Sequence, residues 1–201
     1  PFANREGMIE YYMGLNLTNL TLPNFVGSMP ADHELQLRTP LDVGWGNWIN
    51  FDQNFVGKEA LQKAVDESKY TVVMLEWNSE SVLSVYRAQF DKDKTVTTME
   101  WGEDFSNNRG SNEYHSDAIL NKDGDIIGIS SGRMFSPYYR KMISMATIET
   151  KYSDLGTEVD VLWGNQGTDQ IKIKTNVSRY PYIDTDRNEQ VDTSKIPYGF
   201  K

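Results

Sequence analysis

Apolar and polar residues alternate in several short segments of the second half of the chain, and this period of two restricts the possible folds more than any other feature. In TEVDVLWG, Val159, Val161 and Trp163 fall on one face of an extended chain, while Glu158 and Asp160 fall on the other. The segment QIKIKTNV (170–177) repeats the pattern with lysines on the polar face. Such alternation is typical of strands that face a core on one side and solvent on the other.

Further segments have the composition of strands, being rich in Val, Ile and Thr. They are TVVMLEW (71–77), KTVTTMEW (94–101), DAILNKDGDIIGIS (117–130) and KMISMATIET (141–150). The third contains two strands around a Lys-Asp-Gly turn, because Asp-Gly supplies the backbone geometry that tight hairpins require. About six strands at this spacing predict a mainly β chain, with an antiparallel Greek-key or jelly-roll-like barrel that closes on its own edges.

One or two short helices interrupt the strand pattern. After Gly57 an apolar stripe recurs at helical spacing, and a second helix is expected to begin at a cap formed by Ser79 or Ser81. The first stripe comprises Ala60, Leu61, Ala64 and Val65, and the inner side of the second helix comprises Val82, Val85, Tyr86 and Phe90.

The first part of the chain has no sustained period and many Asn, Thr, Pro and Gly residues. We therefore divide the chain into an irregular lead-in, residues 1–56, and a barrel-like domain, residues 57–201. So long an irregular segment is expected to wrap the barrel or to pack against something outside this chain.

The composition argues against several classes of function. With 20 basic and 29 acidic residues and a net charge of −9, the chain has no basis for a broad nucleic-acid surface. The sequence contains no cysteine, so disulfides and thiolate chemistry are excluded. No apolar run approaches the roughly 20 residues that span a bilayer, and no signal peptide is evident. We expect a cytoplasmic protein that binds neither nucleic acid nor membranes.

Residue chemistry by itself assembles no catalytic site. GISSG (128–132) matches the nucleophile elbow of hydrolases, but both histidines, His33 and His115, precede Ser130, whereas that chemistry needs a base after the serine. We expect instead a bend of small residues at a barrel corner. The two histidines also have no acidic partner at ligand spacing, so we expect no metal site.

Two segments together resemble a known family. TPLDVGWGNWINFDQNFVGKEAL resembles a stretch in which a Pro-x-Glu/Asp-x-Gly turn leads to Asp/Asn-Phe-Ile/Val-Gly-Lys/Arg-Glu/Asp-Ala-Leu. Further along, DGDIIGISSGRMFSPYYRKMISMATI resembles Gly-x-x-Thr/Ser-Ser-Gly-x-x-Ser-Pro followed by a strand of small and apolar residues. Their order and spacing are similar to the C-terminal region of the glycine cleavage T-protein (aminomethyltransferase) family. GTEVDVLWG and FDQNFVGKEAL are similar to its branch of tetrahydrofolate-dependent aromatic O-demethylases of the vanillate and syringate type. The resemblance covers roughly residues 38–198.

The resemblance implies that this chain is the last of three domains, an antiparallel barrel that covers a folate channel. Its cofactor would be tetrahydrofolate, and its partners a small-molecule methyl donor and the N-terminal folate-binding domains of the same protein. The resemblance places the catalytic groups and most of the pterin pocket in those domains. We therefore expect no catalytic residue here and no activity of this chain alone.

The leading parent reaction is O-demethylation of a methoxylated aromatic acid. An aminomethyltransferase of the glycine cleavage or dimethylglycine type is one alternative. A stand-alone binding module without catalysis is another.

Basic residues of such a domain are candidates for contact with the anionic glutamyl tail of folate, because arginine recognises carboxylates in a bidentate manner. The candidates for cofactor contact are Arg133, Arg140, Arg179 and Arg187, together with Tyr138 and Tyr139 beside Pro137. Arg133 stands where the family usually has a small residue, so the motif transfers no role to it. For each arginine the alternative is a solvated surface residue.

The tryptophans have two expected locations. Trp77 and Trp163 end apolar faces and are predicted to lie in the core. Trp45, Trp48 and Phe51 either wedge between the barrel and a neighbouring domain or fill the barrel's own core.

Overall fold

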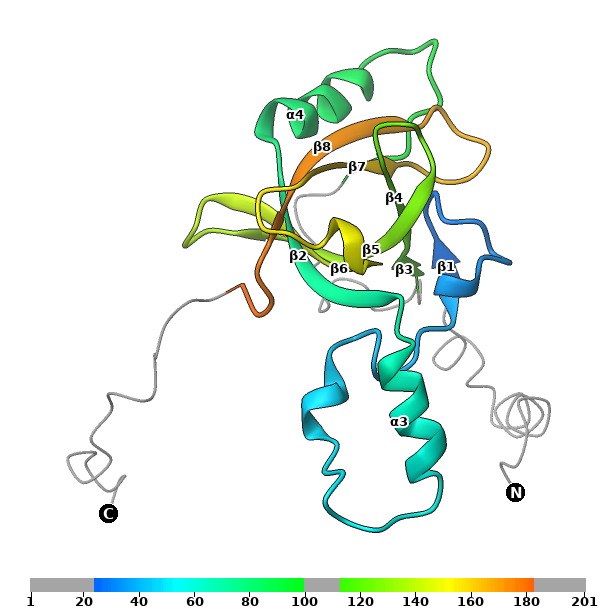
Figure 1. Cartoon of the computed structure of the whole chain (residues 1–201). Helices are drawn as coiled ribbons and strands as arrows, with labels where there is room; N and C mark the ends of the chain where they lie inside the picture. The colour runs from blue at the N-terminus through cyan, green and yellow to red at the C-terminus, as the bar shows by residue number, and fades with distance from the viewer. Residues whose placement is uncertain (1–23, 100–112, 183–201) are drawn as a thin grey trace, which may run out of the picture.

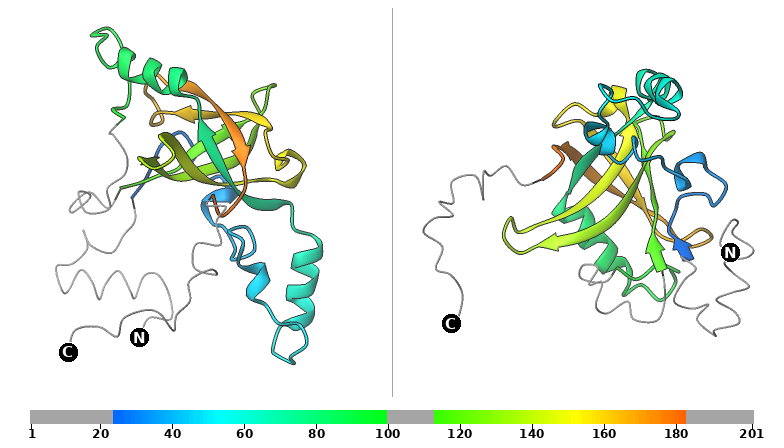
Figure 2. Two further views of the ribbon diagram at one scale, coloured as in Figure 1. Left: turned by 90° about the vertical axis from the view of Figure 1, so that its left-hand side faces the viewer. Right: turned by 90° about the horizontal axis from the view of Figure 1, so that it is seen from below.

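Six strands close into an antiparallel barrel in the spatial order β2-β6-β5-β4-β7-β8. The computed structural model describes residues 24–99 and 113–182, and Figures 1 and 2 show their arrangement. The barrel strands are β2 (Tyr70–Trp77), β4 (Asp117–Leu120), β5 (Ile126–Ser136), β6 (Lys141–Glu149), β7 (Glu158–Trp163) and β8 (Ile171–Ser178). A separate parallel pair consists of β1 (Asn24–Val26) and β3 (Glu113–His115), and the helices are α3 (Lys58–Asp66) and α4 (Ser79–Ala88). The prediction of a mainly β chain built on an antiparallel barrel with two short helices is confirmed.

The barrel contains a Greek key. Strands β4, β5 and β6 follow one another as hairpins, and β2, which precedes them in sequence, lies beside β6. Strands β7 and β8 form a further hairpin, and β8 returns to pair with β2. This last pairing closes the barrel, so β2 has a ladder of hydrogen bonds along each of its edges.

One face of each strand fills the barrel, as the alternation predicts. Val159, Val161 and Trp163 of β7 are buried, whereas the residues between them are exposed or half-buried. Trp77 and Trp163 meet edge to face with ring centroids 6.3 Å apart. Both are core residues, as predicted.

The indole N–H that Trp77 brings into the core has a hydrogen-bond partner in Ser144, which also accepts a hydrogen bond from Ser130. The indole N–H donates to Ser144 Oγ at 2.9 Å, and the hydroxyl of Ser130 donates to the same oxygen at 2.8 Å. All three residues are buried, and an unmade hydrogen bond there would cost about 1–3 kcal/mol.

The GISSG segment, residues 128–132, lies within strand β5. The pairing register of β5 with β6 is irregular between Ser131 and Met134, and Gly132 has a φ of 60°. This is the predicted bend of small residues and not the strand-to-helix turn of a hydrolase.

The lead-in covers one outer face of the barrel. Met29 and Leu35 pack with Ala118, Leu120 and Ile129 in a second core that is separate from the barrel interior. Strands β4 and β5 are therefore covered on both faces, by the barrel interior on one side and by the lead-in on the other.

Two contacts extend this outer layer towards β2. The hydroxyl of Thr147 donates to the carbonyl oxygen of Asp42 at 3.1 Å. Gly44 has a φ of 83°, and a Cβ at this position would meet Val72 Cγ1 at 2.5 Å. Only glycine suits both the left-handed backbone and so close an approach.

The N-cap of helix α4 lies one residue before Ser79, the first of the two predicted caps. This N-cap is Asn78, whose side-chain oxygen accepts a hydrogen bond from the Ser81 N–H at 2.9 Å. Asparagine is as good an N-cap as serine.

The inner faces of the helices agree only in part with the prediction. Val82 and Val85 of α4 are buried, but Phe90 is 90% exposed because the helix ends before it. Helix α3 forms as predicted, although none of its residues is buried. Neither of these helices, nor any other among the described residues, combines the length and hydrophobicity needed to cross a bilayer.

Residues 94–99 form no strand, which corrects the prediction for KTVTTMEW. Their polar groups bind the loop between β7 and β8 instead. The Thr95 N–H donates to the Asp169 carboxylate at 2.7 Å, and the Thr97 hydroxyl accepts from the Asn165 N–H at 2.8 Å. The last two residues of the segment lie outside the described residues.

Replacing Gly128 by alanine is expected to lower the free energy of unfolding by about 1–3 kcal/mol, as overpacking of a core does. The added Cβ would lie 2.5 Å from the Thr147 carbonyl oxygen, a backbone atom of the neighbouring strand. Urea denaturation followed by circular dichroism measures the loss. Gly46→Ala is the control, since a Cβ there would meet only Leu41 Cδ2 at 3.5 Å; equal losses in the two variants would contradict this explanation.

Candidate functional site

The turn between β5 and β6 carries three of the residues predicted to contact the cofactor, Tyr138, Tyr139 and Arg140. It spans residues 137–140 and joins Ser136 to its partner Lys141. Tyr138 is 82% exposed, and Arg140, also exposed, has a φ of 54°. A left-handed backbone at such a residue costs about 1–2 kcal/mol, so an arginine stands where glycine would be less strained. This hairpin projects from the barrel (Figure 1). Its tip exposes a cation, Arg140, and a phenol ring, Tyr138, to solvent.

The base of the hairpin is held by β2 and by the segment after β8. Tyr139 meets Tyr138 and Tyr182 edge to face, with ring centroids 4.8 and 4.9 Å away. The Tyr182 hydroxyl donates to Glu76 at 2.8 Å, and Lys141 forms an ion pair with the other oxygen of that carboxylate. Sequence reasoning missed Glu76 and Tyr182, because no local pattern signals a contact between residues 106 positions apart.

The charges of this cluster are set by its contacts. Burial and the hydrogen bond to Glu76 raise the pKa of Tyr182 to about 12. Burial by itself would raise the pKa of Glu76, but hydrogen bonds from Lys141 and Tyr182 lower it below its ordinary value. Near neutral pH the carboxylate is therefore ionised and the phenol neutral, so the cluster anchors the hairpin and does not exchange protons.

Arg133 lies inside the barrel. It is 4% exposed, its guanidinium lies 4.9 Å from the centroid of the Trp163 ring, and one of its nitrogens donates to Met142 Sδ at 3.6 Å. His115 stacks on the same indole, with ring centroids 5.1 Å apart. The alternative of a solvated surface arginine is wrong for Arg133, because the register irregularity of β5 turns it inward. Its contact with the cofactor stays a prediction.

Of the two remaining candidate arginines, the structure describes one. Arg179 donates from Nε to the Pro181 carbonyl oxygen at 3.1 Å, and Arg187 lies outside the described residues. Of the predicted residues, the structure places Tyr138, Tyr139 and Arg140 on one turn, with Tyr138 and Arg140 exposed.

Residues 39–68, here called the arm, carry a second candidate surface. Trp45 is 53% exposed and Trp48 is 81% exposed, and their rings stack with centroids 5.8 Å apart and an interplanar angle of 12°. Phe51 and Phe55 approach each other at 6.2 Å. The two tryptophans therefore do not fill the barrel's core, which was one of the two locations that the sequence allowed.

A cavity of about 240 Å³ lies beside β4, β7 and β8. Its lining is mostly polar, includes Lys122, Glu158 and Lys174, and contains no aromatic ring. Small-molecule sites are mostly apolar and aromatic, with volumes of about 300–1,000 Å³. The residues of this cavity therefore do not fit a pterin.

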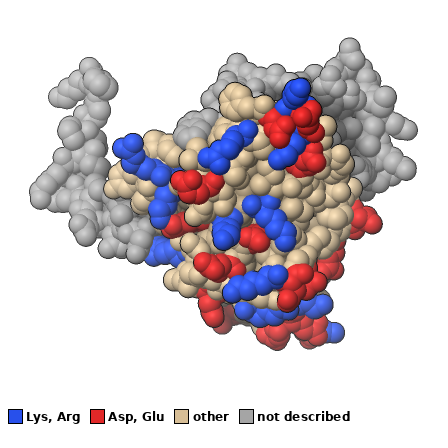
Figure 3. Space-filling model, turned by 90° about the horizontal axis from the view of Figure 1, so that it is seen from above, with Lys and Arg blue, Asp and Glu red and all other residues tan. Residues whose placement is uncertain are grey.

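Other parts of the described surface offer no obvious reactive group. On the face shown in Figure 3, acidic and basic side chains are interspersed and not gathered by sign. Within residues 24–99 and 113–182, no three His, Cys, Asp or Glu side chains are grouped so that they could hold a metal ion.

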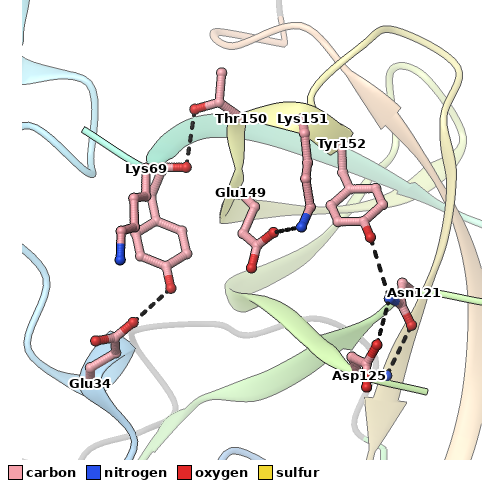
Figure 4. A network of polar contacts seen from close by, with 9 residues as sticks. Glu34, Lys69, Asn121, Asp125, Glu149, Thr150, Lys151 and Tyr152 are labelled. Carbon is pink, nitrogen blue, oxygen red and sulfur yellow. Dashed lines mark hydrogen bonds and ion pairs between the residues drawn. The ribbon is translucent and has the colours of Figure 1, made fainter. Parts of the chain in front are cut away.

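The polar network in Figure 4 ties the lead-in to one end of the barrel. The Tyr70 hydroxyl donates to Glu34 at 2.8 Å, and the Thr150 N–H and hydroxyl both donate to the Lys69 carbonyl oxygen, at 2.9 and 3.1 Å. Burial and the bond to Glu34 raise the pKa of Tyr70 to about 12. These contacts hold segments together, and they set no nucleophile beside a base.

Fold and site thus define a β-barrel domain that exposes a hairpin tip and an aromatic arm. The chain is 38% identical to sesamin methylene transferase from Sinomonas sp. (strain No.22) over 178 residues, which cover 86% of this chain and 39% of that protein. It is 33% identical to syringate O-demethylase from Sphingobium sp. (strain SYK-6) over 165 residues, or 77% of this chain and 34% of that protein. An aminomethyltransferase from Caldanaerobacter subterraneus is 25% identical over 147 residues, or 72% of this chain and 31% of that protein.

The chain belongs to the glycine cleavage T-protein (aminomethyltransferase) family, with O-demethylases among its relatives. It spans only 39% and 34% of the length of the first two relatives. No protein-family model matches the chain. Among solved structures, the glycine cleavage system aminomethyltransferase T from Bartonella henselae is 15% identical, with a TM-score of 0.46 over 89% of this chain and 44% of that one.

The stability of the barrel is expected to fall at alkaline pH in part through Tyr182. A raised tyrosine pKa contributes stability that is present below the ordinary value of 10.0 and is lost as the pH rises through about 12. Urea midpoints of wild type should therefore decrease over this window, and Tyr182→Phe should reduce the decrease because phenylalanine does not ionise. An unchanged pH dependence in this variant would contradict the role assigned to the hydrogen bond with Glu76.

Proposed function

We propose that this chain is the C-terminal barrel domain of a tetrahydrofolate-dependent one-carbon transferase that takes its carbon from an aryl ether. Methoxylated aromatic acids are the leading substrate class. The observation that carries the proposal is the 33% identity to syringate O-demethylase over 77% of the chain. The 38% identity to sesamin methylene transferase adds a second relative named for one-carbon transfer.

The chemistry of the proposed reaction explains the division between this domain and the rest of the protein. Donor and acceptor must be held in line, and the leaving oxygen must be protonated or stabilised as its bond to carbon breaks. Both tasks need a closed pocket with a proton donor, and the cavity beside β4, β7 and β8 does not fit a pterin. We assign the pocket and the donor to N-terminal folate-binding domains of the same protein and expect the chain alone to be inactive. A cytoplasmic location and a small-molecule methyl donor belong to the same proposal.

We assign the contact of this domain with the folate tail to the hairpin tip. Arg140 can form bidentate hydrogen bonds with a glutamyl carboxylate, and the exposed ring of Tyr138 lies on the same turn. The left-handed backbone at Arg140 supports this role, because strain is retained where function needs a particular side chain. Arg187 stays a candidate from the sequence alone.

The complete protein encoded by the gene that carries this sequence is expected to demethylate syringate or vanillate while 5-methyltetrahydrofolate accumulates. Liquid chromatography with mass spectrometry follows both products. The chain alone should give no turnover. If the folded complete protein transfers no methyl group from either acid, the O-demethylase assignment is wrong.

The same assay distinguishes the other branches. Formation of methylenetetrahydrofolate from sesamin would select methylene transfer, the second candidate that the 38% identity favours. Dependence on a lipoylated carrier protein would select the aminomethyltransferase branch. Ligand binding without any one-carbon transfer would select a stand-alone binding module.

Arg140→Gly in the complete protein is expected to raise KM for polyglutamylated tetrahydrofolate by about 10–100-fold, the value of hydrogen bonds to a charged group. Thermal stability should not fall, because glycine relieves the left-handed strain. Arg87→Ala, which removes an exposed arginine of α4, is the matched control and should leave KM unchanged. A wild-type KM in the glycine variant would exclude Arg140 from the folate contact.

A further inference from the structure

The arm, residues 39–68, begins within the lead-in, extends from the barrel and returns to it at β2. Figures 1 and 2 show α3 and the loop before it extending from the end of the barrel opposite α4. Helix α3 is amphipathic, with Ala60, Leu61 and Ala64 in its apolar stripe, but the described residues bury none of it. A helix of this kind normally directs such a stripe at a partner.

Exposed apolar side chains are concentrated on the arm. Five of the thirteen large exposed hydrophobic residues in the described structure lie there, and Val56 is 104% exposed. Continuous apolar surface marks an interaction site, and tryptophan is among the residues most enriched at the centres of interfaces. Since Trp45 and Trp48 are already stacked on each other, little side-chain freedom would be lost when a partner covers them.

We propose that the arm docks into an apolar cleft on the folate-binding part of the same protein, with Trp45 and Trp48 as the central anchor. The identity of this partner rests on the proposed function. The length of the relatives supports it, because 61% of one and 66% of the other lie outside the matched region (100 minus 39 and 100 minus 34). The barrel itself has closed and offers no free strand edge among its six strands, so the arm is the feature left to make a firm connection.

Hydroxyl-radical footprinting of the complete protein tests the docking directly. Trp45 and Trp48 should be oxidised at least about 10-fold more slowly than Phe90, after correction for intrinsic reactivity, because the centre of an interface excludes water. Phe90 is 90% exposed next to α4, at the other end of the barrel, and is the internal control. Rapid oxidation of both tryptophans would overturn the proposal. So would protection that disappears on dilution, since that result identifies a second copy as the occupant.

A paired set of variants gives a second readout. In the complete protein, Trp45→Ala with Trp48→Ala should split one thermal unfolding transition into two and raise the rate of proteolysis between the parts by at least about 10-fold, as expected when an interface loses its hot spot. Phe90→Ala should change neither. If the double variant does not fold, footprinting of the wild type still decides.

These measurements do not depend on folate chemistry. A protected arm in a protein that transfers no carbon would refute the proposed function and leave the docking in place. An active protein with both tryptophans exposed would refute the docking alone.

Discussion

Closure of the barrel by β2 is the constraint on which the rest of the structure depends. This strand pairs with β6 along seven residues and with β8 along four, so it joins the two ends of the sheet. Once both pairings exist, the six strands have no free edges that could pair with another chain. The sheet then has an inside, filled by side chains such as Leu75 and Trp163, and an outside, part of which the lead-in covers.

Because side chains fill the barrel, the candidate binding surfaces lie on the segments that extend from it. Trp163 is fully buried, and Arg133 lies over it inside the barrel, so side chains fill this part of the interior and make it a rigid support. The hairpin tip and the arm extend from this support. Both carry exposed aromatic rings and are held to the barrel where they begin. The hydrogen bond between Tyr182 and Glu76 holds the hairpin, and the close packing of Gly44 against Val72 holds the arm.

The candidate site could be predicted only where local pattern is sufficient. The Ser-Pro-Tyr-Tyr-Arg segment is visible in the sequence, and the structure places its Tyr138 and Arg140 on one exposed turn, while their contact with a cofactor stays a prediction. The inward position of Arg133 was not predicted, because it follows from a register irregularity in β5 that no composition rule announces. The partnership of Glu76 with Tyr182 was missed for a different reason, since it exists only after β2 and the segment beyond β8 have come together.

The sequence by itself determined the six barrel strands, the inner face of β7 and the resemblance to the family, because a period of two and a short motif are both read locally along the chain. Only the tertiary structure decided that residues 94–99 bind a loop instead of joining the sheet, and that Trp45 and Trp48 stay outside the barrel. The physical reason is the same in each case. Burial and pairing depend on what the closed barrel brings to a residue from far along the chain, and a residue's own preference does not contain that information.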